Sequence, residues 1–136
     1  MNRSVAMVAL AVALLPACRS SDAASTRVRV DIEHSRFALE RDAFEVGETV
    51  TFVIENTDPI DHEFILGDER VQVRHEEGRQ RHHHGAVPGE VSVPAGETRT
   101  TTFTFTEEGR LIYACHLPRH YDYGMAGEVS ISASRT

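Results

Sequence analysis

The chain of 136 residues is poor in sulfur and has neither Trp nor Lys, so that every cation other than His is Arg. It has two Cys and three Met, and Met1, Met7 and Cys18 lie in the first 18 residues. The remainder therefore has one thiol, Cys115, and one thioether, Met125. This scarcity excludes a disulfide framework, and we expect no bridge between the two cysteines, because it would consume the best metal ligand in the chain.

Long hydrophobic runs are also absent. The single apolar run, 5–15, follows Arg3 and is too short to span a bilayer as a stable helix. We interpret residues 1–17 as a signal peptide. Its end, Leu-Pro-Ala-Cys18, resembles the lipobox of bacterial lipoproteins, which implies cleavage before Cys18, lipidation of that thiol and an anchor on the outer side of a bacterial membrane, periplasmic or at the cell surface. An ordinary secretory signal with a chance cysteine is the alternative, and both interpretations export the chain.

The mature chain that this predicts is acidic. The whole sequence carries a net charge of −7, and loss of Arg3 leaves 13 Arg against 21 acidic residues, a charge of −8. Such a surface disfavours nucleic acid and anionic lipid and favours encounter with a basic protein. We expect a tether over 18–27, which is small and polar, followed by one monomeric domain over 28–133.

The domain shows no convincing amphipathic helix. Short β-branched and aromatic runs alternate with a period of two and are separated by Gly, Pro and Asn turn signals. This pattern predicts an all-β, Greek-key antiparallel β-sandwich. The predicted strands cover 28–32, 36–39, 49–54, 62–66, 91–93, 100–106, 110–115 and 127–132.

One segment, 71–88, interrupts the strands. It is charged and rich in His, with no apolar period, and we expect a mobile excursion between strands. His75, His82, His83 and His84 in it form either a second, looser and exposed copper or zinc site, or a solvated loop without a specific role.

The segment from Cys115 to Met125 carries the strongest chemical signal. A thiolate, the imidazole of His120 and a thioether follow one another with four residues between each, which is the ligand set of a mononuclear blue-copper site. Taken singly, Cys115 at the end of an apolar strand fits a core residue, and Met125 fits a gap-filler. The joint spacing favours the metal site.

A single loop does not hold copper rigidly in both oxidation states, so a further ligand is needed from elsewhere. His62 is the natural candidate, because it follows a turn over 56–60 and opens the apolar segment 64–66. Ligands from two strand-linked positions, far apart in sequence, hold the donors in place during electron transfer.

These motifs, Asn56-x5-His62-Glu-Phe-Ile and Tyr-Ala-Cys115-His-Leu-Pro-x-His120-x4-Met125, resemble the cupredoxin family of type 1 copper proteins, including its small exported plastocyanin-like and rusticyanin-like members. The resemblance covers 28–133. It implies that His62 and His120 are equatorial imidazole ligands of one copper, Cys115 the equatorial thiolate and Met125 the weak axial ligand that, with the shell around the sulfur, tunes the redox potential.

The sequence departs from the family pattern at Arg119, where glycine commonly precedes the second histidine. If this position requires a positive φ, arginine is strained there by about 1 kcal/mol. Arg119 also offers a cation for partner docking beside the ligand edge, although an ordinary surface arginine is the simpler interpretation.

His116 suggests a second resemblance, to the last domain of multicopper oxidases, in which histidines flank the cysteine on both sides. Here residue 114 is alanine, and the His-x-His pairs of a trinuclear centre are missing. We expect His116 to point away from the copper, because neighbours on an extended segment face opposite ways. We assign His34, in the first connection, a structural role.

The sequence therefore predicts an exported, membrane-tethered blue-copper protein that transfers single electrons and is not an enzyme. We expect a redox partner such as a c-type cytochrome or an oxidase subunit, and no nucleic acid. The alternative is an extracytoplasmic copper chaperone or copper-resistance protein that uses the His-rich segment. A small copper enzyme built on His116 or that segment is a third interpretation.

Overall fold

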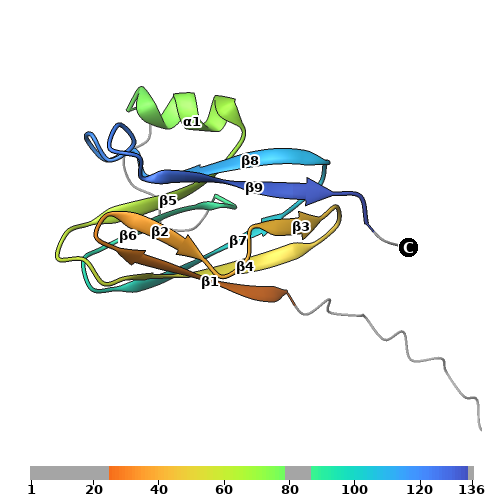
Figure 1. Ribbon diagram of the computed structural model, residues 1–136, viewed down its shortest axis with the longest axis horizontal. Helices are drawn as coiled ribbons and strands as arrows, with labels where there is room; N and C mark the ends of the chain where they lie inside the picture. The colour runs from red at the N-terminus through yellow and green to blue at the C-terminus, as the bar shows by residue number, and fades with distance from the viewer. Residues whose placement is uncertain (1–24, 79–86, 135–136) are drawn as a thin grey trace, which may run out of the picture.

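The computed structural model describes residues 25–78 and 87–134, and these form a sandwich of two β-sheets with one helix on its outer face (Figure 1). The first sheet has the strand order β2-β1-β4-β7. Its strands are β1 (Thr26–Glu33), β2 (Arg36–Leu39), β4 (Thr49–Asn56) and β7 (Thr98–Thr104). Within the described residues, no helix has the length and apolar character needed to cross a membrane.

The second sheet has five strands in the order β3-β9-β8-β5-β6. These are β3 (Ala43–Glu45), β5 (His62–Gly67), β6 (Glu90–Val93), β8 (Gly109–Ala114) and β9 (Ala126–Ser132). The all-β sandwich that the sequence predicts is confirmed. The short strand β3 was not expected, and β1 with β4 and β3 with β9 pair in parallel, whereas the other pairs are antiparallel.

The core lies between the sheets and follows the alternation in the sequence. In β4 the side chains of Val50, Phe52 and Ile54 are fully buried, while those between them are partly exposed. Phe52 contacts Phe64 from the opposite sheet, with ring centroids 5.4 Å apart. Full burial of each such side chain stabilises the fold by roughly 1.5–3 kcal/mol.

Strand β5 is different, because all six of its residues are buried. Phe64 and Leu66 belong to the core between the sheets, and the opposite face of β5 lies under helix α1 (Glu69–Glu76). The helix begins at Asp68, whose side chain accepts a hydrogen bond from the backbone N–H of Val71 at 3.0 Å, the usual role of an N-cap.

The helix corrects our expectation of a mobile excursion without regular structure of its own over 71–88, since residues 71–76 belong to α1. The sequence lacks an apolar helical period here because the buried face of α1 is polar, with Gln72 and His75 as its buried residues. Residues 79–86 lie outside the described part of the chain, as do 1–24, and our predictions for a signal peptide and a lipidated Cys18 concern those residues.

Several connections gather at one end of the sandwich, which Figure 1 shows at the left. They are the β1–β2 turn at His34 and Ser35, the connection between β4 and β5, and the long connection between β8 and β9. Helix α1 runs along β8 toward this end (Figure 1). The predicted copper ligands His62 and Cys115 stand where β5 begins and just after β8 ends.

The close approach of β8 and β9 generates a prediction at Gly127. Gly127 pairs with Tyr113, and a Cβ at Gly127 would collide with the tyrosine ring, coming within 2.8 Å of Cε2 and nearer still to Cζ and the hydroxyl. We expect Gly127→Ala to lower the free energy of unfolding by about 1–3 kcal/mol, measured by urea denaturation. Ala126→Ser, at the exposed neighbouring position, is the control, and equal stability of the two variants would contradict the predicted collision.

Candidate metal centre

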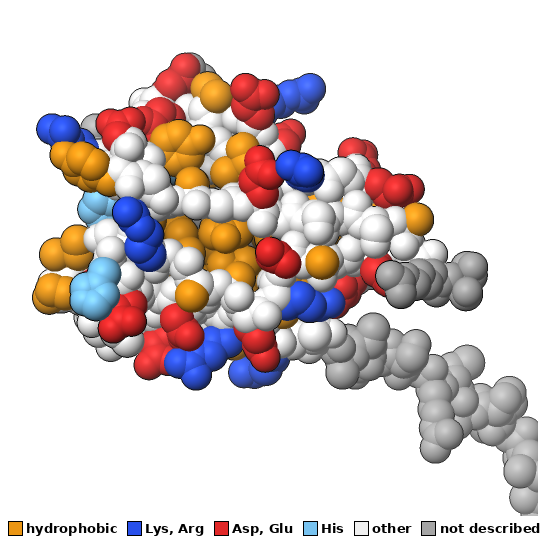
Figure 2. All heavy atoms as spheres, viewed as in Figure 1, with side chains coloured by type: hydrophobic (Ala, Val, Ile, Leu, Met, Phe, Trp, Pro, Cys, Tyr) orange, Lys and Arg blue, Asp and Glu red, His pale blue; other side chains and the backbone are white. Residues whose placement is uncertain are grey.

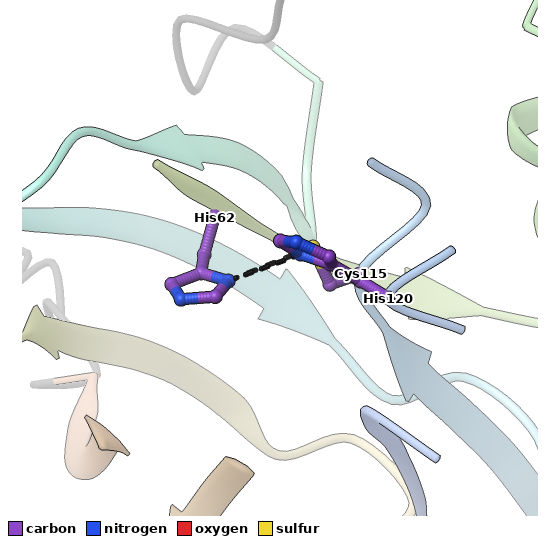
Figure 3. Close-up of side chains that lie close together, drawn as sticks. All are labelled: His62, Cys115 and His120. Atoms are coloured by element: carbon purple, nitrogen blue, oxygen red, sulfur yellow. Dashed lines mark hydrogen bonds between the residues drawn. The ribbon is translucent and has the colours of Figure 1, made fainter. Parts of the chain in front are cut away.

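Three of the predicted ligands meet at this end of the sandwich. The ligand atoms of His62, Cys115 and His120 all lie within 4.8 Å of one another (Figure 3). The Nδ1 atoms of the two imidazoles are 3.3 Å apart, and Cys115 Sγ lies 3.2 Å from His120 Nδ1 and 4.0 Å from His62 Nδ1. His62, more than 50 positions away in sequence, thus joins the neighbouring Cys115 and His120 in presenting one sulfur and two nitrogens to a common point.

The site is shielded from solvent on most sides. Cys115 is fully buried and His62 is 1% exposed, whereas His120 remains partly exposed. Burial raises the pKa of the Cys115 thiol to about 11, although the backbone N–H of Glu63, 3.4 Å from Sγ, acts in the opposite direction. Burial also lowers the pKa of His120, and the neighbouring His62 adds to that shift.

Asp58 fixes the orientation and the tautomer of His62. Its Oδ2 lies 2.8 Å from His62 Nε2, on the side of the ring that faces away from the cluster. Because a carboxylate only accepts hydrogen bonds, His62 carries its proton on Nε2 and directs the lone pair of Nδ1 toward Cys115 and His120. This is the carboxylate–histidine arrangement that orients imidazole ligands of metals.

The Asp58 carboxylate is itself held by the β1–β2 turn. It accepts hydrogen bonds from the backbone N–H groups of His34 at 2.6 Å and Ser35 at 2.7 Å, both at positive φ. Burial by itself raises the pKa of Asp58, but these N–H groups and the His62 imidazole outweigh it, and the net pKa is lowered. Asp58 is therefore ionised. The structural role that we expected for His34 is carried by its backbone.

The connection from Cys115 to Met125 is closed by its own backbone. The N–H of Cys115 donates to Met125 O at 3.1 Å, and the N–H of Met125 donates to His120 O at 3.0 Å. Met125 is 1% exposed and belongs to the hydrophobic core. The connection therefore places Met125 directly beside the backbone of Cys115 and His120.

The ligand atoms and their separations indicate which metal the site can bind. Donor separations of 3.2–4.0 Å are those of ligands that share one ion through bonds of roughly 2.0–2.3 Å. Two imidazoles and one thiolate, with a thioether residue alongside, are the donors of a blue-copper centre and differ from the closed Cys-rich sets of structural zinc. The residues fit copper.

Comparison with known proteins agrees with this geometry. The model of the copper-binding plastocyanin/azurin family matches residues 26–132. This chain belongs to that family. It binds copper, and His62, Cys115 and His120 with Met125 are a set typical of a type 1 copper site. The cupredoxin resemblance inferred from the motifs is confirmed.

Relatives of this cupredoxin include two proteins named copper-resistant cuproprotein CopI. The one from Rubrivivax gelatinosus is 34% identical over 124 residues, which cover 85% of this chain and 73% of that protein. The one from Pseudomonas aeruginosa is 28% identical over 141 residues, covering 79% and 77%.

Solved structures show the same fold at lower identity. Auracyanin A from Chloroflexus aurantiacus is 20% identical, with a TM-score of 0.63 over 79% of this chain and 98% of that one. Rusticyanin from Thiobacillus ferrooxidans is 16% identical, with a TM-score of 0.57 over 78% and 76%.

The structure places His75 and His116 outside this cluster. His116 points away from the cluster, as its position next to Cys115 predicts, and it contacts α1, which was not predicted. His75 is only 3% exposed and lies against Glu90, so it fits neither of the two alternatives that the sequence left open for it, an exposed metal site or a solvated loop. His82, His83 and His84 lie outside the described residues.

Two residues that contact the ligands, Asp58 and Glu63, were not predicted as site residues from the sequence. Asp58 stands before a proline in a polar turn, and Glu63 follows His62 in a buried strand. Nothing in the local pattern separates Asp58 from an ordinary turn residue. A charged residue inside an apolar strand, as at Glu63, is the one local signal that was available.

The contact of Asp58 with His62 predicts that Asp58 contributes to copper affinity. Replacement by Asn removes the carboxylate that holds His62, and we expect Asp58→Asn to weaken copper binding by roughly 10–100-fold, as loss of such partners does elsewhere. The measurement is competition with a copper chelator of known affinity. Asp122→Asn, an exposed aspartate in the ligand connection, is the control, and equal affinities in both variants would refute the role of Asp58.

Arg119 generates a prediction for stability. Its φ is +73°, so the strain that we anticipated at this position is present, while its guanidinium lies 5.0 Å from the centre of the Tyr123 ring. We expect Arg119→Gly to raise the free energy of unfolding by about 0.5–1 kcal/mol, because glycine adopts this φ without steric cost. Arg119→Ala keeps the strain, loses the contact with the ring and should be less stable than the original. Thermal unfolding of the copper-free chains separates the two effects, and a destabilised glycine variant would show that the contact outweighs the strain.

Proposed function

We propose that this cupredoxin is an exported copper-resistance protein whose type 1 site exchanges single electrons. The observation that carries the proposal is the buried cluster of one thiol and two imidazoles beside Met125. Copper bound to such donors cycles between Cu(II) and Cu(I) and supplies a one-electron redox step. In this assignment His62, Cys115 and His120 are the equatorial ligands and Met125 is the weak axial ligand.

Residues of this chain hold the copper ligands rigidly and leave His120 accessible to a partner protein. Asp58 and the backbone hydrogen bonds of the 115–125 connection hold the ligands in place before the metal arrives. His120 is the partly exposed ligand, and exposed apolar side chains, Ile60 at 47% and Tyr123 at 61%, belong to the connections at this end of the sandwich. Figure 2 shows hydrophobic and His side chains together at this end. This supports electron exchange with a docked protein through the His120 edge, and the acidic composition favours a basic partner such as a c-type cytochrome.

Copper resistance and export rest on other observations. The relatives from Rubrivivax gelatinosus and Pseudomonas aeruginosa are both named for copper resistance. The predicted signal peptide over 1–17 and the lipobox-like cysteine favour a protein tethered to the outer side of a membrane. In this proposal the protein needs no substrate and is not an enzyme.

A second candidate function is copper storage or hand-over without electron transfer. It is favoured by the three consecutive histidines over 82–84, since imidazole binds copper well. The two candidates differ in which residues matter. Electron exchange depends on Cys115, whereas storage depends at least as much on the histidine run.

Cys115→Ser tests the proposal directly. With the original chain we expect an intense thiolate-to-copper charge-transfer band that saturates at one equivalent of Cu(II), and we expect the variant to lack it, because serine offers no thiolate. The same variant should fail to restore growth on copper to a strain that lacks the gene.

The control replaces His82, His83 and His84 by Ala together. This variant should keep the band and restore growth. Colourless binding beyond one equivalent by the original chain, or restored growth with Cys115→Ser and none with the histidine control, would instead establish the storage function. Met125→Leu separates the role of the reduction potential from that of copper binding. It keeps the three equatorial ligands and changes the axial donor that tunes the potential.

A further inference from the structure

Helix α1 contacts both ring nitrogens of His116, the residue that follows Cys115. His116 Nδ1 lies 2.7 Å from Glu76 Oε2, and His116 Nε2 lies 2.7 Å from Gln72 Oε1. Gln72 and Glu76 are four residues apart and therefore stand on the same face of the helix. Both ring nitrogens of His116 thus have partners on one helix face, although His116 itself lies beyond the end of β8.

The orientation of the Gln72 amide is set by the sheet below it. Its Nε2 donates to the backbone carbonyls of Ile65 at 3.3 Å, Gly67 at 3.3 Å and Ile112 at 2.8 Å. With its NH₂ group committed to β5 and β8, the amide presents its oxygen to His116. Gln72 therefore links strands β5 and β8 to the histidine ring.

Stacked rings close the remaining sides of His116. The ring of His75, which stands between Gln72 and Glu76 on α1, is parallel to it within 22° at 5.8 Å between centroids. Tyr121, from the ligand connection, stacks on it at 5.1 Å and 21°. The His116 side chain is 1% exposed. Hydrogen bonds in its plane and rings beside it leave the imidazole little freedom to rotate.

Two hydrogen bonds of Glu63 connect His116 to the Cys115 thiol. The backbone N–H of His116 donates to Glu63 Oε1 at 3.0 Å, and the backbone N–H of Glu63 donates to Cys115 Sγ at 3.4 Å. Glu63 is 4% exposed, so both contacts are sheltered from water. Displacement of His116 would therefore move the backbone on both sides of Sγ.

We propose that Gln72, Glu76 and His116 form a clamp that positions the Cys115 sulfur. These are positioning residues for the type 1 site, which α1 fastens to the sheet through the ring next to the thiol. The proposal deepens the proposed function and rests on Cys115 being the copper thiolate. The clamp explains why the buried face of α1 is polar. This face contacts the His116 imidazole and not an apolar core.

Substitutions on α1 test the clamp without touching a copper ligand. Glu76→Ala removes an exposed carboxylate, so folding should survive, and Glu76→Gln restores a hydrogen-bond acceptor for His116. Gln72→Leu removes the buried link. Glu69→Ala is the control, since it removes the same charge from the same helix at an exposed position without a contact to His116.

The first readout needs no copper. In the full chain carrying Cys18→Ser, Cys115 is the single thiol, and its rate of reaction with the disulfide reagent DTNB reports how often the surrounding loop opens. Each clamp variant, Glu76→Ala or Gln72→Leu, should react roughly three- to tenfold faster, as loss of one hydrogen bond of ordinary net strength allows. Glu76→Gln should recover most of the original rate, and Glu69→Ala should keep it.

The second readout uses the copper-loaded chains. The clamp variants should still bind one equivalent but show a shifted charge-transfer band and a changed reduction potential, because the sulfur is less firmly placed. Variants that unfold at lower temperature while keeping the original thiol reactivity, band and potential would overturn the proposal and leave α1 a purely structural helix. Absence of the band in the unmodified chain, with faster thiol reaction in the clamp variants, would contradict the proposed function and leave the clamp intact.

Discussion

The antiparallel pairing of β5 with β8 is the interaction on which the rest of the molecule depends. It aligns Ile65 with Ala114 and Leu66 with Tyr113, so that the start of β5 lies beside the end of β8. His62 and Cys115, which stand at those two ends, meet because of this register. A shift by one residue would turn every side chain of β5 to the opposite face and remove His62 from the thiol. The core packing that fixes the register thus also builds the metal centre.

Both sides of the centre are then supported by separate parts of the fold. On the His62 side, the β1–β2 turn holds Asp58, and Asp58 holds the imidazole. On the Cys115 side, Glu63 contacts the sulfur, and α1 holds His116. The electron transfer that we propose would require ligands that do not rearrange between oxidation states. Support from both directions allows a site at the end of a sandwich to meet that requirement although it is built partly on loops.

The two supports also explain why so many polar groups are buried near this end. Asp58, Glu63, Gln72 and His75 are all buried. Burial of such groups is costly unless hydrogen bonds or charges compensate it. Asp58 receives backbone and imidazole N–H groups, Gln72 bonds three carbonyls, and His75 lies against Glu90. Each of these buried polar groups lies against a ligand residue or against His116 beside it.

The sequence by itself determined the donor set and the fold class. The spacing from Cys115 to Met125 is local, and period-two alternation in segments such as Thr49–Asn56 is a property of neighbouring residues, so both are legible without a structure. Tertiary structure alone decided that the backbone of His34 and Ser35 holds Asp58 and that His116 is held by Gln72, 44 positions away. Such contacts join residues whose local surroundings resemble an ordinary turn or a charged loop. The strand pairing that brings them together is a property of the whole chain, and no local pattern records it.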